Sequence, residues 1–267
     1  MLELENVEVT YPGPPPFTAV KGINLTVPTG STVGLVGESG SGKSSIARAA
    51  IGLTPVTKGR ILLDGDDVTN PKGKALRLLR GKAQLVFQDP HASLNPRMEI
   101  AMAVQEAVSV ATGKRITSQS CAVTALDLLD KVGVPKAAMR RYPHQLSGGQ
   151  LQRVSIARAL ALEPSLMILD EVTASLDVSV QARILNLLRQ LQRELDVSML
   201  YISHDLSVIR YLADHVYVMR HGEMVESGTA DAVFDAPQQE YTKALLSAVP
   251  TLGGSRWRAR HEPVAAL

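Results

Sequence analysis

The chain has 267 residues, with 28 Lys and Arg against 26 Asp and Glu, and its formal net charge is +2. This near balance argues against a nucleic-acid partner, and the single cysteine, Cys121, excludes an intramolecular disulfide, a Cys-rich metal site and a cysteine-ligated cluster. No apolar run approaches the roughly 18 to 20 residues of a membrane span, and the first residues lack the basic start and apolar core of a signal peptide, so we expect a soluble, cytosolic chain.

Two strands are expected before the first glycine-rich loop. Apolar residues recur over residues 2–9, which suggests an edge strand, and Tyr11 follows ahead of a turn rich in Pro and Gly. Apolar and polar residues alternate over residues 23–27, which is the period of a half-buried strand. The short link between these strands predicts an antiparallel β subdomain that packs against a parallel core.

The glycine-rich loop lies between an apolar strand at residues 32–36 and a helix at residues 45–51. Its residues Gly37, Gly42, Lys43 and Ser44 fit the pattern G-x-x-x-x-G-K-[ST]. Glycines let successive backbone N–H groups point inward and a helix N-terminus adds its positive dipole end, so this context favours phosphate over a plain turn with an exposed Lys. We expect Lys43 to reach the β- and γ-phosphates of a nucleotide and the Ser44 hydroxyl to ligate Mg²⁺. The predicted binding residues of this phosphate loop are Gly37, Glu38, Ser39, Gly40, Ser41, Gly42, Lys43, Ser44 and Ser45.

The middle of the chain changes from strand patterns to helix patterns. A strand is expected at residues 59–65 and a buried strand at residues 83–87. From about Asp89 to Leu146 the apolar spacing becomes helical, at residues 100–110 and 122–132. This change predicts an α-helical lobe inserted into an α/β domain.

The predicted division of the chain has three parts. Residues 1–88 and 162–250 form an α/β core that binds ATP, residues 89–161 form the inserted helical lobe, and residues 251–267 form a C-terminal tail. The tail holds Arg256, Arg258 and Arg260 beside the one Trp, and we expect it to be solvated.

An apolar run at residues 166–169 ends in the carboxylates Asp170 and Glu171. Further strands are expected at residues 198–202 and 216–219, with an amphipathic helix over residues 180–195. A buried parallel strand that ends in acids opens its carboxyl end towards a bound phosphate. Downstream of a phosphate loop, Asp170 is suited to hold Mg²⁺ and Glu171 to polarise an attacking water.

The signature segment, Leu146-Ser-Gly-Gly-Gln150, opens a helix over residues 150–162. It can be read as a Ser N-cap followed by two permissive glycines. It can also be read as a second phosphate site, because the backbone donors, the hydroxyl and the helix dipole all face the same point. One nucleotide does not need two such helix ends. The second would therefore come from another copy or from a sister subunit.

In this order of motifs the chain resembles the ATP-binding cassette (ABC) ATPases, whose fold is a P-loop NTPase (RecA-like) α/β core with an antiparallel β subdomain and an inserted helical lobe. In that family two cassettes dimerise head to tail and enclose ATP between one phosphate loop and the other signature. The resemblance implies that Tyr11 stacks on adenine, although an ordinary core Tyr is the alternative. It implies that Gln88 lies near Mg²⁺ and the attacking water, and that His204 contacts the γ-phosphate instead of merely capping a helix. The residues assigned to the partner's nucleotide and to communication across the dimer are Ser147, Gly148, Gly149, Gln150 and Asp177.

Three further segments, residues 86–97, 141–149 and 241–250, look like the ATPase subunits of oligopeptide, dipeptide and nickel importers. That likeness implies two integral-membrane permease subunits, a second ATP-binding subunit, an extracytoplasmic solute-binding protein and a place on the cytoplasmic face of the membrane. Peptide is the expected cargo, with nickel or another small solute as the alternative. A soluble ABC ATPase that acts on DNA or ribosomes is disfavoured because the chain has one cassette and no long coiled-coil insertion. A small-molecule kinase is disfavoured because it has no use for the signature segment.

Overall fold

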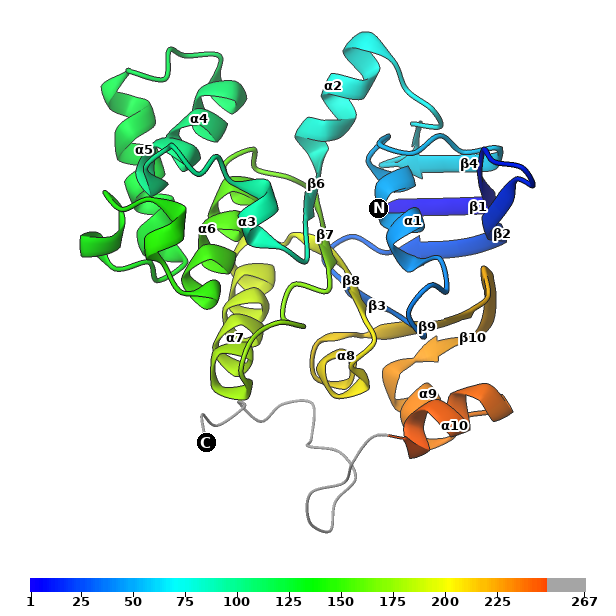
Figure 1. Ribbon diagram of the computed structural model, residues 1–267. Coiled ribbons are helices and arrows are strands. Elements are labelled where there is room, and N and C mark those ends of the chain that lie inside the picture. The colour runs from blue at the N-terminus through cyan, green and yellow to red at the C-terminus, as the bar shows by residue number, and fades with distance from the viewer. Residues whose placement is uncertain (249–267) are drawn as a thin grey trace.

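A mostly parallel six-stranded sheet runs through the centre of Figure 1, in the computed structural model that describes residues 1–248. The predicted tail, its three arginines and the last two residues assigned to the core lie outside the described residues. The strand order is β10-β9-β3-β8-β7-β6, and only β10 runs antiparallel to its neighbour. These strands are β3 (Thr32–Val36), β6 (Ala83–Val86), β7 (Leu166–Asp170), β8 (Ser198–Ser203), β9 (His215–Arg220) and β10 (Glu223–Thr229).

Both faces of this sheet are covered, which explains why its inner strands read as unbroken apolar runs. Every residue of β3, β7 and β8 is buried. Because successive side chains of a strand point to opposite faces, Leu166 and Ile168 enter one core while Met167 and Leu169 enter the other. The core that holds Leu166 and Ile168 also contains residues of α1 (Lys43–Ala50) and of a second sheet. The other core packs against α6 (Gly148–Leu160), α7 (Val178–Leu195) and α8 (Leu206–Leu212).

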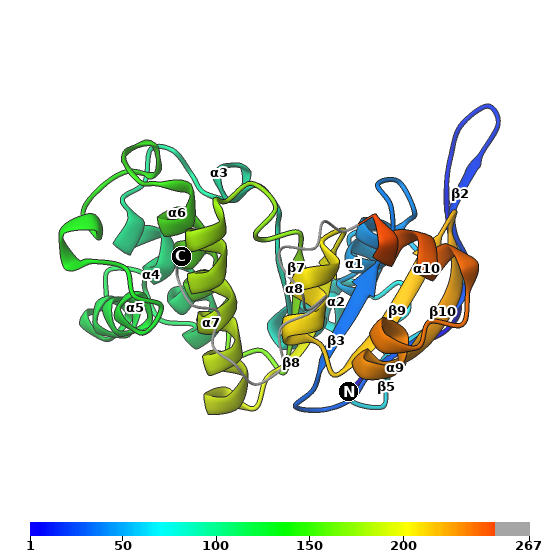
Figure 2. The ribbon, with the colours of Figure 1, turned by 90° about the horizontal axis from the view of Figure 1, so that it is seen from below.

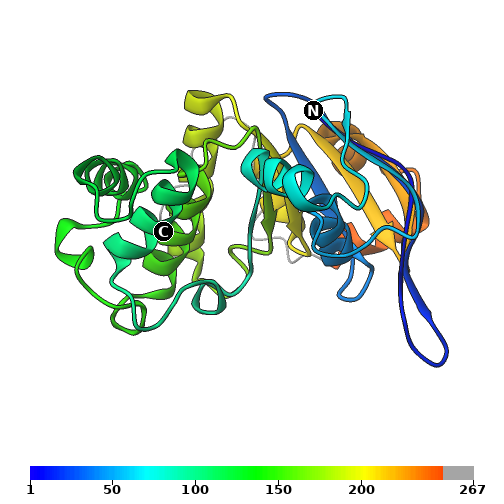
Figure 3. The same cartoon turned by 90° about the horizontal axis from the view of Figure 1, so that it is seen from above.

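The second sheet is antiparallel and has the order β2-β1-β4-β5. Its strands are β1 (Leu2–Tyr11), β2 (Phe17–Val27), β4 (Lys58–Leu63) and β5 (Asp66–Asp67). The expectation that β1 is an edge strand is wrong, because Leu4 pairs with Leu25 on one side and with Ile61 on the other. Alternation along β1 correctly gives its buried face, but alternation carries no information about its backbone partners. The β1–β2 hairpin projects from the rest of the chain in Figures 2 and 3.

A group of helices lies to one side of the six-stranded sheet, with α7 between the two (Figure 1). The predicted helical segments are present as α4 (Ile100–Thr112) and α5 (Gln119–Lys131), which pack together and bury Cys121. The short helix α3 (Pro90–Ser93), the 3₁₀ turns η1 (Lys136–Ala138) and η2 (Pro143–Gln145), and α6 complete this group. The exact limits of the inserted lobe stay a prediction.

The elements that were not expected from the sequence include α2 (Gly73–Lys82), β10, α9 (Ala230–Asp235) and α10 (Glu240–Ser247). The expectation that residues 83–87 form a buried strand holds only in part, for Ala83 and Val86. Strand β6 lies at the edge of the sheet, so Gln84 and Leu85 are half-buried and Phe87 is 38% exposed. Among residues 1–248 no helix has both the length and the apolar character that crossing a bilayer requires.

Candidate functional site

The phosphate loop connects β3 to α1 and closes around the side chain of its own lysine. Gly42 is the N-cap of α1 with a φ of 107°, and a Cβ there would lie 2.3 Å from the Ala19 carbonyl oxygen. Lys43 Nζ donates to the Gly37 carbonyl at 2.8 Å and to the Glu38 carbonyl at 2.7 Å. The loop thus curls around an ammonium group in the manner expected of a phosphate cradle.

Lys43 is 5% exposed, and burial lowers the pKa of its ammonium. The carboxylates of Glu171, Asp170 and Glu38 act against this shift and favour the charged form. A buried cation that is held mainly by carbonyl oxygens has strong affinity for an anion, because a direct ion pair is worth more in a dry site than in water. The geometry therefore prepares Lys43 to meet a phosphate.

Asp170 lies at the carboxyl end of β7, where Ser44 Oγ donates to its Oδ1 at 3.2 Å. Burial raises the pKa of Asp170, and the Ser44 hydrogen bond opposes that rise. A hydroxyl and one buried carboxylate are hard oxygen donors of the kind that bind Mg²⁺ together with substrate phosphates and water. Among residues 1–248 no group of three His, Cys, Asp and Glu converges on one point. The residues fit a Mg²⁺ ion that is held partly by the nucleotide.

Glu171 follows Asp170 in the left-handed region, with a φ of 50°. Few residues other than Gly adopt this conformation, and here a hydrogen bond from the Glu171 N–H to the Ile202 carbonyl at 2.9 Å supports it. The sharp turn brings Glu171 Oε1 to 3.0 Å from His204 Nδ1 at the end of β8. Asp205, not His204, caps α8 by accepting from the Ser207 N–H at 2.9 Å. His204 is therefore free to act with Glu171.

Two cavities flank the phosphate loop and gather residues that are far apart in the sequence. A cavity of about 280 Å³ is lined by Tyr11, Phe17, Ala19, Ser39, Gly40, Gly42, Lys43, Ser44, Ser45, Gln88 and Glu171. A cavity of about 370 Å³ is lined by Gly37, Glu38, Ser39, Glu171, His204, Leu206 and Leu245. The Tyr11 hydroxyl donates to Ser45 Oγ at 3.1 Å, which ties the β1–β2 hairpin to the start of α1. The structure thus places Tyr11 and Gln88 beside the phosphate loop, as the sequence led us to expect.

Four of these lining residues were not predicted from the sequence: Phe17, Ala19, Leu206 and Leu245. Phe17 is 63% exposed and follows a Pro-rich turn, and an aromatic side chain that is left in solvent at that place was the available signal. Leu245 lies on α10, a helix whose pattern gave no reason to place it at the phosphate loop.

The signature segment forms a separate cluster at the start of α6. Ser147 Oγ accepts from the Gln150 N–H at 3.4 Å, and Gln150 Oε1 accepts from the Ser147 N–H at 3.1 Å, which is a capping box. Both Ser147 and Gly148 are exposed. Within residues 1–248, the segment lines neither cavity of the phosphate loop. Another molecule can therefore reach the exposed start of this helix.

Gly149 has a packing role of its own in this segment. A Cβ at Gly149 would lie 2.3 Å from Val180 Cγ1, so only glycine lets α6 and α7 approach this closely. Asp177 caps α7 by accepting from the Val180 N–H at 2.9 Å, and this bond is the main reason that its pKa is lowered. The signature segment and Asp177 therefore lie close together at the starts of two adjoining helices.

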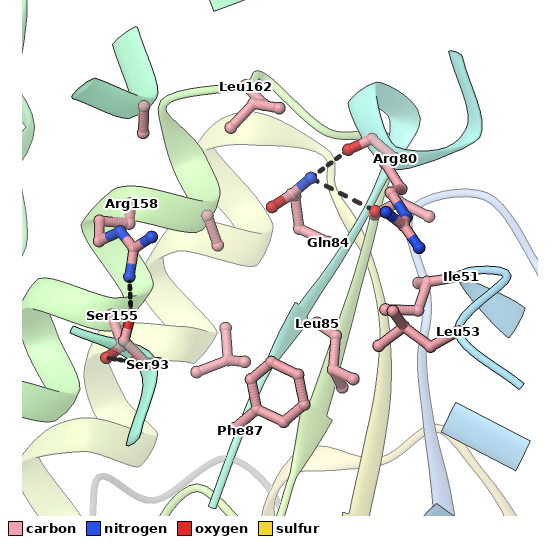
Figure 4. Close-up of a pocket in the computed structure, with 14 residues that line it drawn as sticks. Ile51, Leu53, Arg80, Gln84, Leu85, Phe87, Ser93, Ser155, Arg158 and Leu162 are labelled. Carbon is pink, nitrogen blue, oxygen red and sulfur yellow. Dashed lines mark hydrogen bonds between the residues drawn. The ribbon is translucent and has the colours of Figure 1, made fainter. Parts of the chain in front are cut away.

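A third hollow, of about 360 Å³, lies between β6 and α6 (Figure 4). Its walls come from the end of α1, from α2 and β6, and from the group of helices. Phe87 lies on its floor and directly precedes Gln88, which lines the phosphate-loop cavity. The labelled residues in Figure 4 are Ile51, Leu53, Arg80, Gln84, Leu85, Phe87, Ser93, Ser155, Arg158 and Leu162. We call this hollow the β6–α6 groove.

The chain is similar over most of its length to ATP-binding proteins of transport systems. A family model described as ABC transporter matches residues 20–174. The oligopeptide transport ATP-binding protein OppF of Lactococcus lactis subsp. lactis (strain IL1403) is 42% identical over 264 residues, which cover 96% of this chain and 82% of that protein. OppF of Salmonella typhimurium (strain LT2) is 48% identical over 238 residues, which cover 88% of this chain and 71% of that protein.

Solved structures agree with these relatives. The dimeric structure of a post-hydrolysis state of the ATP-binding cassette MJ0796, bound to ADP and Pi, superposes with a TM-score of 0.79 at 29% identity. The match covers 86% of this chain and 99% of that one. The expected α/β fold, a P-loop core with an antiparallel subdomain and a helical insertion, is confirmed.

Proposed function

The chain belongs to the ABC transporter family, and we propose that it hydrolyses ATP to energise the import of di- and oligopeptides. The names of the OppF relatives support peptide as the cargo. One observation carries the catalytic part of the proposal. Lys43, Ser44, Asp170, Glu171 and His204 come from three separate segments and meet at the carboxyl ends of β3, β7 and β8.

In the proposed reaction the chain mainly positions groups and neutralises charge. The backbone N–H groups of the phosphate loop and the Lys43 ammonium bind the β- and γ-phosphates. Glu171, held by His204, orients a water in line with the γ-phosphorus and takes its proton. The free His204 nitrogen then faces the γ-phosphate oxygens. The products are ADP and inorganic phosphate.

Two oxygen donors would hold Mg²⁺ in this site, the Ser44 hydroxyl and the Asp170 carboxylate, with the Gln88 amide beside them. Bound there, the ion supplies charge neutralisation on the β- and γ-phosphate oxygens. The adenine base is assigned to the other end of the cavity, where Tyr11 and Phe17 offer aromatic faces.

A second ATP-binding subunit, identical or homologous, completes each site in this proposal. Ser147, Gly148, Gly149 and Gln150 of that subunit would donate to the γ-phosphate, and Asp177 would carry the contact across the dimer. This assignment is supported by the exposure of Ser147 and Gly148 and by their absence from both cavities of the chain's own phosphate loop. The dimeric state of the MJ0796 cassette is consistent with it.

Two integral-membrane permease subunits are the proposed partners, which places the chain at the cytoplasmic face of the membrane. An extracytoplasmic solute-binding protein would deliver the cargo to them. The β6–α6 groove supports the permease contact, since Phe87 on its floor is bonded to Gln88 of the nucleotide cavity. A helix seated in the groove would therefore sense the state of the nucleotide through one peptide bond.

The decisive experiment measures the product that the purified chain makes from ATP and Mg²⁺. Release of free phosphate by the wild type, and its loss in a Lys43→Ala variant, supports the proposal. A phosphorylated small molecule would instead indicate a kinase. Co-purification then distinguishes two kinds of ABC ATPase. A transporter subunit co-purifies with integral-membrane proteins, whereas a soluble ABC ATPase co-purifies with nucleic acid or ribosomes. Uptake of a labelled tripeptide against labelled nickel by cells with and without the gene decides between the two cargoes.

A further inference from the structure

The C-terminal helix α10 lies against the phosphate loop, as the view in Figure 2 suggests and one hydrogen bond establishes. The Glu38 backbone N–H donates to the Tyr241 hydroxyl at 3.3 Å, across 203 residues of sequence. Leu245, one helical turn after Tyr241, lines the cavity that also holds Glu171 and His204. One face of α10 therefore forms part of the wall of the nucleotide site.

The peptide group that joins Gly37 to Glu38 is held on both of its polar atoms. Its N–H, that of Glu38, is bound to the Tyr241 hydroxyl, and its carbonyl, that of Gly37, accepts from Lys43 Nζ at 2.8 Å. The orientation of this peptide affects where the loop presents its lysine and the N–H groups that follow. Without these bonds the peptide could rotate, because Gly37 on one side of it is conformationally permissive.

The Tyr241 ring is itself held in position. The Arg220 guanidinium carbon lies 4.7 Å from the ring centroid, within the range of a cation–π contact. Arg220 ends β9, which pairs with β3 directly before the phosphate loop. Burial raises the pKa of Tyr241, so its hydroxyl stays neutral at physiological pH. The phenol is thus anchored to the sheet on one side and to the loop on the other.

We propose that Tyr241 is a positioning residue for ATP binding, which holds the peptide group between Gly37 and Glu38, and through it Lys43, in the orientation that receives the triphosphate. This inference rests on the function proposed above. Without the hydroxyl, the loop must be ordered by the nucleotide at the moment of binding, and that ordering reduces affinity. Chemistry after binding is unchanged, since Tyr241 contacts no reacting atom. A positioning role of this kind raises KM for ATP and leaves kcat as it was.

The test compares two variants that each lose one phenol hydroxyl. Tyr241→Phe keeps the ring over which Arg220 lies and removes the acceptor for Glu38. Tyr217→Phe is the matched control, because the Tyr217 hydroxyl accepts from the Thr26 backbone N–H at 3.1 Å, outside the two cavities. Both tyrosines are half-buried. Affinity for a fluorescent ATP analogue, steady-state kcat and KM, and the melting temperature are measured for the whole chain.

A net hydrogen bond of ordinary strength predicts that Tyr241→Phe raises Kd and KM by about 2- to 10-fold, with kcat within about twofold of the wild type. Tyr217→Phe leaves Kd and KM unchanged. A merely structural role for Tyr241 would lower the folded, active fraction and hence kcat, not raise KM. Equal affinity in Tyr241→Phe and the wild type overturns the inference, as does an equal loss in both variants. If the wild type binds no nucleotide, the proposed function fails instead.

Discussion

Replacing Glu171 by Gln keeps the size of the side chain and an oxygen that accepts from His204, but it removes the negative charge. In the structure this carboxylate is 3.0 Å from His204 Nδ1, and its side chain is 18% exposed. A base in such a partly dry position contributes about 10²- to 10⁴-fold to the rate. At 1.36 kcal/mol for each tenfold change, the variant loses about 2.7 to 5.4 kcal/mol of transition-state stabilisation.

ATP binding by Glu171→Gln is expected to be as tight as in the wild type or tighter. The lost charge faces the cavity that receives the phosphates, so its removal reduces repulsion. The assay follows phosphate release at saturating ATP and Mg²⁺ together with solution mass, because slow turnover lets a closed dimer accumulate. Glu163→Gln is the matched control, since Glu163 has a φ of 49° and is exposed before β7. Wild-type turnover in Glu171→Gln would refute the assignment of the base.

Three further substitutions test other parts of the site. Lys43→Ala should weaken nucleotide binding by about 10- to 100-fold, the worth of a charged hydrogen bond, as measured by calorimetry. Gly149→Ala should destabilise the fold by about 1 to 3 kcal/mol in urea unfolding, because its Cβ meets Val180 Cγ1 at 2.3 Å, and Val180→Ala added to it should restore part of the loss. Asp170→Asn should abolish Mg²⁺-dependent hydrolysis yet stabilise the nucleotide-free chain. Burial raises the pKa of Asp170, so the stability of the wild type falls as pH rises through the range between the ordinary value near 4 and the raised one. The gain of the Asn variant should be absent below about pH 4 and full above the raised pKa, and urea unfolding at several pH values without nucleotide measures it.

Long, regular patterns gave the fold class and the order of most elements. The apolar runs that became β7 and β8 could be read directly, because strands covered on both faces need no alternation. Helix α2 was missed because its apolar face is short: Leu79 is its only buried residue, with Leu76 half-buried beside it. Partners across a sheet were also out of reach. The alternation of apolar and polar residues along β1 gives its buried face. Its pairing with β2 and β4 depends on those other segments of the chain, which the alternation does not identify.

The candidate site, like the fold, could be predicted from the sequence only in part. The phosphate loop and the pair Asp170 and Glu171 are contiguous in sequence, and their chemistry follows from residue type and spacing. The contact between Tyr241 and Glu38 joins residues 203 positions apart, and neither neighbourhood indicates it. The roles of Tyr11 and Gln88 came from resemblance to the family, whereas the signature segment was read as a second phosphate site from its own residues. All of these roles stay predictions.

The central claim, that one chain's phosphate loop works with the signature segment of another, is tested most directly by mixing two inactive variants. Lys43→Ala has a defective loop and an intact signature, whereas Ser147→Arg has the reverse. In a head-to-tail dimer of one copy of each variant, the intact loop of Ser147→Arg meets the intact signature of Lys43→Ala, so one of the two sites is complete. When equal amounts pair at random, half of the dimers are of this mixed kind. The account predicts that an equal mixture recovers about one quarter of the wild-type hydrolysis rate. A mixture that stays at the sum of the two separate rates, while the wild-type chain alone hydrolyses ATP, would contradict it.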